Sequence, residues 1–310
     1  MKVKNFSRIC LIISGCVMLI ALVMAIFGAG INPGIDFAGG LTIQYEMNQA
    51  FDHKDVEDAL NAQGLSGCRI ARSGESGLQI RVPSMAGEAE IQTLQSGLEA
   101  TLLKKYPGMD TETATARYEG PVAGAGLVRN TGLCVLLIMA LALVYIAIRF
   151  GFSSGVAAVL GILHDLLIVL SFTVLLRGVL RVNVSFAAAM LAVAGYSIVT
   201  AIALFDRVRE NNEKPGCSKM KKEDVVNLSV GENLDRTVHT TLTALILLVA
   251  LCILGVTSVR EVSLPIVIGV LSSVYSANMI DGYVWAFLEE RRKGKKGAAK
   301  KGAKLKAKKA

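Results

Sequence analysis

The sequence predicts a polytopic α-helical membrane protein with six transmembrane helices and one small α+β, ferredoxin-like extracytoplasmic domain between the first two helices. The composition is the first observation: 53% of the 310 residues are hydrophobic. The mean hydropathy of +0.51 is well above that of an ordinary soluble domain. The second observation is the length of the apolar segments, because a helix needs about 20 mostly apolar residues to cross a bilayer. Six segments meet this condition, at residues 9–30, 131–148, 155–176, 183–204, 237–256 and 263–288.

The first apolar segment is interpreted as a retained anchor and not as a signal peptide. Lys2, Lys4 and Arg8 precede it, within residues 1–8, which form the expected cytoplasmic N-terminus. A signal peptide has a similar basic start, but its apolar run covers only about 7–15 residues. The run here extends over 9–30 and five further spans follow it. We therefore expect this segment to stay in the membrane.

The distribution of Lys and Arg predicts that both termini lie in the cytoplasm. Basic residues are retained on the cytoplasmic side of membrane spans. Here they gather before the first span, in the loop 205–236 and in the tail 289–310. The long segment 31–130 is different, because it holds 13 Asp and Glu against 8 Lys and Arg. It is therefore expected on the extracytoplasmic side.

The tail 289–310 ends in GKKGAAKKGAKLKAKKA, which has almost nothing to bury. A segment of this composition is expected to be disordered. Two roles fit its lysines: contact with anionic membrane lipids, where each Lys contributes about 1 kcal/mol, or contact with ribosomal RNA. A solvated topology signal is the alternative, and no other contact with nucleic acid is expected.

Residues 31–130 are predicted to form a domain with the element order βαββαβ. Alternating apolar residues predict strands, and longer helical patterns that begin near an Asp or end before a Pro predict helices. The strands are expected at 41–47, 67–73, 77–82 and 113–119, and the helices at 52–63 and 88–106. This order is that of the split βαβ, ferredoxin-like plan.

No catalytic or metal-binding pattern occurs in this domain. His53 stands alone, and the nearby carboxylates fit a solvated helix face. Of the six cysteines only Cys68 falls in this domain, so no disulfide is expected within it. The chain also has no phosphate-binding Walker loop. We therefore expect a domain that docks or holds something, and no enzyme activity.

The stretch NPGIDFAGG at 32–40 is a more specific pattern, directly after the first span. Gly34, Gly39 and Gly40 permit backbone angles or close approaches that a Cβ would forbid. Asp36 lies among apolar neighbours, where it either caps backbone amides in a tight helix-to-strand turn or contacts a substrate. Both interpretations remain open from the sequence.

The loop 205–236 begins directly after the fourth span with four charged residues, Asp206, Arg207, Arg209 and Glu210. They either anchor the span at the lipid phosphates or form a hinge that couples span movement to the loop. Further along, apolar residues recur at i, i+4 and i+8, namely Val226, Val230 and Leu234. This spacing predicts an amphipathic segment on the inner leaflet.

Four stretches, in this order, resemble the SecD/SecF family of protein-export membrane proteins: GIDFAGG at 34–40, GILHDLLIVLSF at 161–172, GYSIVTAIALFDRVRE at 195–210 and NLDRTVHTTLTALILL at 233–248. The outer domain of about 95 residues resembles the SecF branch, because SecD carries a much larger domain after its first span. The family is in turn similar to the RND transporter superfamily, in which related sets of spans meet at a repeat interface.

The resemblance implies an accessory subunit of the Sec preprotein translocase in the cytoplasmic membrane of a prokaryote. It implies a SecD-like subunit and the SecYEG channel as partners, with accessory proteins of the YidC/YajC type and an unfolded preprotein as cargo. It implies no cofactor other than a coupling ion, H⁺ or Na⁺, and a driving force such as the proton motive force.

Ionisable side chains inside spans are candidates for ion coupling, because they are costly in lipid. His164 and Asp165 fall in the third span and match the family's HD motif, which fits either a relay or helix packing. Arg236 opens the fifth span and matches a family arginine implicated in coupling. At a helix end, however, an Arg can also snorkel to the headgroups.

The fourth span departs from the family pattern. Family members typically read GYSINDT, with a buried Asp proposed to carry the ion, whereas this chain has Val199 for the Asn and Thr200 for the Asp. A Thr hydroxyl usually bonds to the carbonyl one turn back. Asp281 in the sixth span lies at a similar depth and is expected to supply the displaced carboxylate, facing Thr200 or the SecD spans. In rival interpretations the helix ends early at Gly282, with Asp281 at the membrane edge, or SecD alone carries the carboxylate.

Two other functions stay open. The chain could be half of an RND-type exporter of hydrophobic small molecules. Two large outer domains would favour that function, whereas this chain has one small outer domain. It could also be a non-pumping membrane assembly subunit, because the fourth-span Asp is absent.

Overall fold

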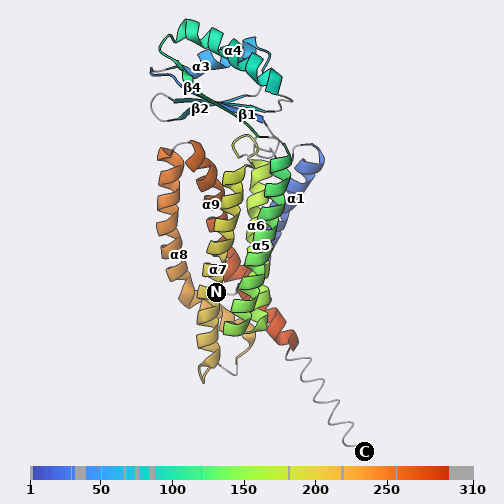
Figure 1. Cartoon of the computed structure of the whole chain (residues 1–310). Helices are drawn as coiled ribbons and strands as arrows, with labels where there is room; N and C mark the ends of the chain where they lie inside the picture. The colour runs from blue at the N-terminus through green and yellow to red at the C-terminus, as the bar shows by residue number, and fades with distance from the viewer. Residues whose placement is uncertain are drawn as a thin grey trace, which may run out of the picture.

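The protein consists of a bundle of long helices with a small sheet domain at one end, as the computed structural model shows (Figure 1). The structure describes residues 3–28, 30–31, 40–49, 51–65, 68–73, 77–83, 88–119, 121–180, 182–217, 220–255 and 257–292. Residues 32–39, which include Gly34, Asp36 and Gly39, and the Lys-rich tail from 293 onward therefore lie outside the described residues.

Six helical stretches in the described part of the chain are long and apolar enough to cross a membrane. Their helices are α1 (Val3–Ile26), α5 (Pro121–Phe150), α6 (Phe152–Leu175), α7 (Val184–Glu213), α8 (Lys222–Leu254) and α9 (Thr257–Tyr275). A π-helical segment, η1 (Ser276–Asp281), continues α9, and the helix then runs on to Arg292. The chain is therefore a polytopic helical membrane protein.

Helices α6, α7 and α9 form the centre of the bundle. In the most apolar window of each span, 61% of the residues of α6, 50% of those of α7 and 61% of those of the α9 span are buried, against 11% in α1, α5 and α8. The outward faces of α1, α5 and α8 carry Leu, Ile and Val side chains. Such surfaces suit a lipid or a partner helix, and polar groups that must avoid lipid have to lie on the central helices.

The sheet domain contains β1 (Gly40–Glu46), α3 (His53–Ala62), β2 (Arg69–Ser73), β3 (Gly77–Pro83), α4 (Glu88–Lys105) and β4 (Asp110–Glu119). The strands lie in the order β2-β3-β1-β4, and each neighbouring pair is antiparallel. The central register places Ile43 opposite Ile80 on one side and Ala116 on the other. Each of the six elements begins and ends within three residues of its expected position.

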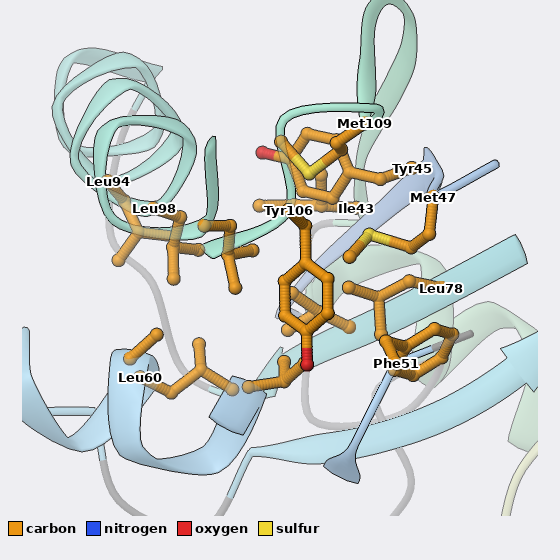
Figure 2. Close-up of a cluster of buried hydrophobic side chains, with 14 of the residues drawn as sticks. Ile43, Tyr45, Met47, Phe51, Leu60, Leu78, Leu94, Leu98, Tyr106 and Met109 are labelled. Carbon is orange, nitrogen blue, oxygen red and sulfur yellow. The ribbon is translucent and has the colours of Figure 1, made fainter. Parts of the chain in front are cut away.

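The core of this domain lies between the sheet and its two helices (Figure 2). Alternate residues of β1, namely Leu41, Ile43 and Tyr45, are buried, while Gln44 and Glu46 between them are exposed. Leu60 of α3 and the leucines of α4 cover the buried face. The opposite face of the sheet is turned toward the helix bundle (Figure 1). This one-sided burial is typical of an antiparallel sheet.

The prediction of an amphipathic segment on the inner leaflet is wrong. Residues 222–254 form one continuous helix, α8, and Val226 and Val230 pack in a buried cluster with Phe205 and Trp285. The apolar spacing thus reflects packing against neighbouring helices and not contact with lipid headgroups.

The fourth span is expected to end near residue 204, but the helix that contains it, α7, continues to Glu213. Charged residues do not end a helix once it has left the membrane, and the first helix breakers after this span are Pro215 and Gly216. Asp206, Arg207, Arg209 and Glu210 are therefore helical residues of α7, not part of a loop.

The ends of the other spans shift as well. Helix α1 begins at Val3, and α5 begins at Pro121, ten residues before the predicted span. The interpretation that the sixth helix ends at Gly282 is wrong, because helical structure continues to Arg292. Asp281 is only 1% exposed, so it does not lie at an open helix end.

Candidate functional site

Asp165 lies at the centre of the bundle and is 0% exposed. Its carboxylate accepts hydrogen bonds from four hydroxyl groups, which we call the serine cage: Ser197 (2.7 Å), Ser272 (2.7 Å), Ser273 (2.9 Å) and Ser276 (2.9 Å). Hydrogen bonds to an ionised acceptor are stronger than neutral ones. The arrangement therefore suits an ionised carboxylate.

The serine cage arises from the spacing of serines on two helices. Ser272, Ser273 and Ser276 lie at i, i+1 and i+4 of the last helix, which places them on one face, and α7 supplies Ser197 from a second direction. A Cβ on Gly269 would overlap the side chain of Val193 on α7. The glycine thus allows the close packing of α9 on α7 that brings the serines to Asp165.

Two members of the cage have an alternative acceptor. The hydroxyl of Ser273 also lies 2.9 Å from the carbonyl oxygen of Gly269, and the hydroxyl of Ser276 lies 3.4 Å from the carbonyl oxygen of Ser273. Each hydroxyl has a single hydrogen, so it can turn between Asp165 and its own helix. The cage can therefore adjust to the charge at its centre.

His164 lies at the edge of the cage. Its Nδ1 is 3.3 Å from Oδ1 of Asp165, and its ring meets the ring of Tyr275 edge-on, with centroids 5.6 Å apart. Its Nε2 is buried and has no hydrogen-bond partner in the described part of the chain. The hydroxyl of Tyr275 lies 3.1 Å from that of Ser14 on α1 and 3.4 Å from that of Ser272. A series of side chains thus connects α1 with Asp165.

Asp281 is a second buried carboxylate beside the first. It ends the π-helical segment η1, and its carboxylate lies against Gly161 of α6, where a Cβ would overlap it. Its Oδ1 has no hydrogen-bond partner among the described residues. Gly161 is one turn before Asp165 on the same face of α6, so the two carboxylates lie on the same side of that helix.

The π-helical segment explains how Asp281 reaches α6. In an α-helix, five residues turn through about 500°, so Asp281 would point about 140° away from Ser276. In a π-helix the residue at i+5 is hydrogen-bonded to residue i and lies nearly above it. Ser276 and Asp281 can therefore both face α6, one at Asp165 and the other at Gly161.

Thr200 and Arg236 do not join this site. The hydroxyl of Thr200 donates to the carbonyl oxygens of Ser197 (2.9 Å) and Tyr196 (3.3 Å) on its own helix, as expected for a Thr inside a helix. Among the described residues, no hydrogen bond joins Thr200 to Asp281, so the expectation that the two side chains face each other receives no support. Arg236 is exposed on α8, and Val199 is 61% exposed on α7.

The charged residues near the end of α7 form pairs at the end of the bundle opposite the sheet domain (Figure 1). Arg207 donates to Glu210 (2.7 Å), and Arg209 donates to Glu213 (3.0 Å) and to the carbonyl oxygen of Arg149 (3.2 Å). Asp206 is exposed. Exposed pairs of this kind contribute little to stability, so these residues belong to a solvated helix surface and not to the buried site.

The sequence interpretation missed the serine cage, Gly161 and Tyr275. The signal was present in SSVYS at 272–276, because three hydroxyl groups on one face of an apolar helix require a polar partner. A second polar series was also missed, in which Asn233 donates to Thr237 (3.0 Å) and Asn278 (3.4 Å). Among the described residues, no group of three His, Cys, Asp or Glu side chains is placed to hold a metal ion.

The fold and the site define an integral membrane protein in which a polar, acidic centre is enclosed by apolar helices and a sheet domain is attached at one end. Comparison with known proteins then specifies the class. The family model described as "Protein export membrane protein SecD/SecF, C-terminal" matches residues 99–291, and the "SecD/SecF GG Motif" model matches residues 25–50. The chain belongs to the SecD/SecF family of protein-export membrane proteins.

The proteins to which this chain is similar include SecF proteins. The chain is 32% identical to the protein translocase subunit SecF of Thermodesulfovibrio yellowstonii over 266 residues, which covers 84% of this chain and 86% of that protein. It is 31% identical to the translocase subunit SecDF of Bacillus subtilis, covering 82% of this chain but only 34% of that protein. A crystal structure of SecDF from Thermus thermophilus superposes with a TM-score of 0.69 and 28% identity, over 92% of this chain and 38% of that one. The chain thus spans less than half of the SecDF proteins that it matches.

Proposed function

We propose that the chain is the SecF-type accessory subunit of the Sec preprotein translocase, that it pairs with a SecD subunit, and that it promotes gradient-assisted protein export. The observation that carries the proposal is the buried, hydroxyl-bound Asp165 at the HD motif of a bundle that matches SecF relatives along most of its length. A buried ionisable group at the centre of a membrane protein is a functional candidate by default.

The SecDF relatives support a SecD partner, because each joins a segment similar to this chain to a longer remainder. The outward faces of α5, α7 and α8, with Val199 and Arg236 among their exposed residues, are available for such a partner. A partner that covers these faces would place Arg236 in an interface, where its side chain could contact the partner and take part in coupling.

The further elements of the proposal follow from the sequence and the fold. Both termini lie in the cytoplasm, and the sheet domain, whose strand order matches the ferredoxin-like plan, lies outside the membrane. The SecYEG channel, accessory proteins of the YidC/YajC type and an unfolded preprotein are the proposed partners. The Lys-rich tail contacts anionic lipids.

Ion coupling in this subunit is assigned to Asp165 and Asp281 because Thr200 cannot carry a charge. The two carboxylates are buried on adjacent helices, whereas the hydroxyl of Thr200 is occupied by its own helix. The coupling ion is H⁺ or Na⁺. Asp281→Asn, which keeps the shape but removes the ionisable group, should therefore reduce the gradient-dependent part of export.

The experiment that tests the function is export of a preprotein in a strain depleted of its own SecF and complemented with this chain and its SecD. Export should recover, and collapse of the coupling gradient should remove most of the gain. The same strain allows purification in mild detergent, in which SecD should accompany the chain. Lack of both recovery and a SecD partner would contradict the proposal.

One observation favours a second function, that of an assembly subunit that does not pump ions. The carboxylate expected at the fourth span is replaced by Thr200, which favours a non-pumping assembly subunit. That function predicts normal complementation by Asp165→Asn and Asp281→Asn variants, with the same response to the gradient as the unmodified chain.

A further inference from the structure

The two buried carboxylates have very different surroundings. Asp165 receives hydrogen bonds from the whole serine cage, whereas Oδ1 of Asp281 receives none from the described residues. An unpaired charge in a dry interior costs many kcal/mol, and the usual outcome is that the group becomes neutral. The difference in hydrogen bonding therefore bears on which of the two carboxylates holds a proton.

We propose that Asp281 is a proton-binding site that remains a neutral carboxylic acid while Asp165 beside it remains an anion. Binding forms an O–H bond on a carboxylate oxygen of Asp281, and release breaks that bond and passes the proton to water. The assignment as a coupling site rests on the proposed function, but the protonation states do not. Like charges placed together in a dry site do not both ionise readily, so one proton on the pair is the stable arrangement.

Among the described residues, the groups that face Asp281 offer no compensating cation. Helix α6 presents Asp165 and His164, and His164 already lies beside Asp165. From α7 and α8, Leu204, Val226 and Val230 surround the neighbouring Gly282. From α1, Ser7 donates to the carbonyl oxygen of Met279, and Cys10 packs against the buried cluster that contains Met279.

Lys222 of α8 is the buried cation on the inner side of the site. It lies 5.8 Å from the ring centroid of Trp285, one helical turn beyond Asp281, and its Nζ donates to Asn212 of α7. Lys222 is thus held at the inner end of α7. On the face of α6 that contacts Asp281, the buried charged residue is Asp165, one turn from Gly161.

The π-helical segment gives the proton a structural consequence. It holds the carboxylate of Asp281 against Gly161, where a neutral acid is tolerated and an anion next to Asp165 is not. Loss of the proton therefore favours a return of residues 276–281 to α-helical hydrogen bonding, which would turn Asp281 away from α6. Because Ser7 of α1 donates a hydrogen bond to the carbonyl oxygen of Met279 in this segment, the rearrangement would also displace α1.

Two measurements on the purified full-length chain test the protonation states. The first is infrared spectroscopy at neutral pH, where a protonated carboxyl group gives a C=O band separate from those of carboxylates. We expect this band in the unmodified chain and in Asp224→Asn, which changes an exposed carboxylate of α8. We expect its loss in Asp281→Asn. A missing band in the unmodified chain, or a band that persists in Asp281→Asn, would overturn the proposal.

The second measurement needs no variant. Dicyclohexylcarbodiimide, an apolar reagent, reacts with protonated carboxyl groups: the acid proton moves to a carbodiimide nitrogen while the carboxylate oxygen attacks the central carbon. Mass spectrometry should locate the adduct on Asp281 and not on Asp165. Labelling of Asp165 instead, or of neither residue, would overturn the proposal.

These outcomes are independent of export. A chain that fails to complement a SecF-depleted strain can still show the proton on Asp281. In that case the proposed function is wrong and the proton-binding site is confirmed. A chain that complements but shows no protonated Asp281 retains the function and loses the site.

Discussion

The carboxylate of Asp281 lies directly against the backbone of Gly161, one turn before Asp165 on α6. Two residues 120 positions apart in the sequence thus bring the last helix against α6 at the buried site. An unpartnered buried polar group lowers stability, and an ionisable group inside a membrane span is a functional candidate.

Gly161→Ala should destabilise the protein, because the new methyl group would overlap the carboxylate of Asp281. Overpacking of this kind costs about 1–3 kcal/mol. The control is Gly195→Ala on α7, where a Cβ meets nothing within 4 Å and where Ala should stabilise the helix by about 0.5–1 kcal/mol. Thermal unfolding in detergent measures both. If Asp281→Ala does not relieve the effect of Gly161→Ala, the two residues are not in the contact described.

Ser197→Ala should lower the free energy of unfolding by about 1.5–3 kcal/mol, the range for a hydrogen bond to a charged group. Its hydroxyl donates to Asp165 at 2.7 Å. Ser171→Ala is the matched control, because that serine is also buried in a central helix but donates to the carbonyl oxygen of Leu167. If both variants lose the same free energy of unfolding, the hydrogen bond from Ser197 is no stronger than a bond to a neutral carbonyl. That result would show that the serine cage does not stabilise Asp165 as an anion.

The sheet domain could be predicted almost completely from its sequence. Leu41, Ile43 and Tyr45 alternate with polar residues, and this period of two determines both the strand and its buried face. The membrane spans were equally clear from their length, but their ends were not. At the end of α7, charges were interpreted as a stop, whereas only Pro215 and Gly216 break the helix.

The candidate site could be predicted only in part. Asp165 and Asp281 stand out because an ionisable group in an apolar span is rare. Their surroundings depend on how three helices pack, and serine is too common in helices to signal a carboxylate by itself. The π-helical segment has no recognisable sequence pattern, so the direction in which Asp281 points could not be deduced.

Asn211→Ala should loosen the inner ends of α7 and α8, where the predicted hinge lies. Asn211 is 0% exposed, and its amide donates to Ser229 (3.1 Å) and Glu232 (2.8 Å) across the two helices. Loss of the amide leaves the buried Ser229 hydroxyl without this donor, at a cost of about 1–3 kcal/mol. Hydrogen exchange of residues 205–232 should become faster. Glu210→Ala removes only exposed ion pairs, with Arg207 and Lys214, and should change little. A similar acceleration in both variants would contradict the assignment.

The outer domain should lose part of its stability in acid through Asp55. Hydrogen bonds from Lys105 (2.5 Å) and from the hydroxyl of Tyr106 (2.6 Å) hold the pKa of the Asp55 carboxyl below its usual value. A carboxyl whose pKa is lower in the folded state contributes stability above the pKa of the unfolded chain, about 3.9, and loses it as the pH falls through the folded-state pKa. Hydrogen exchange of α3 and α4, corrected for the intrinsic rate at each pH, should therefore accelerate in acid, and Asp55→Asn should flatten this dependence. Glu57→Gln, on the exposed face of the same helix, should keep the original profile, and an unchanged profile in Asp55→Asn would show that another carboxylate is responsible.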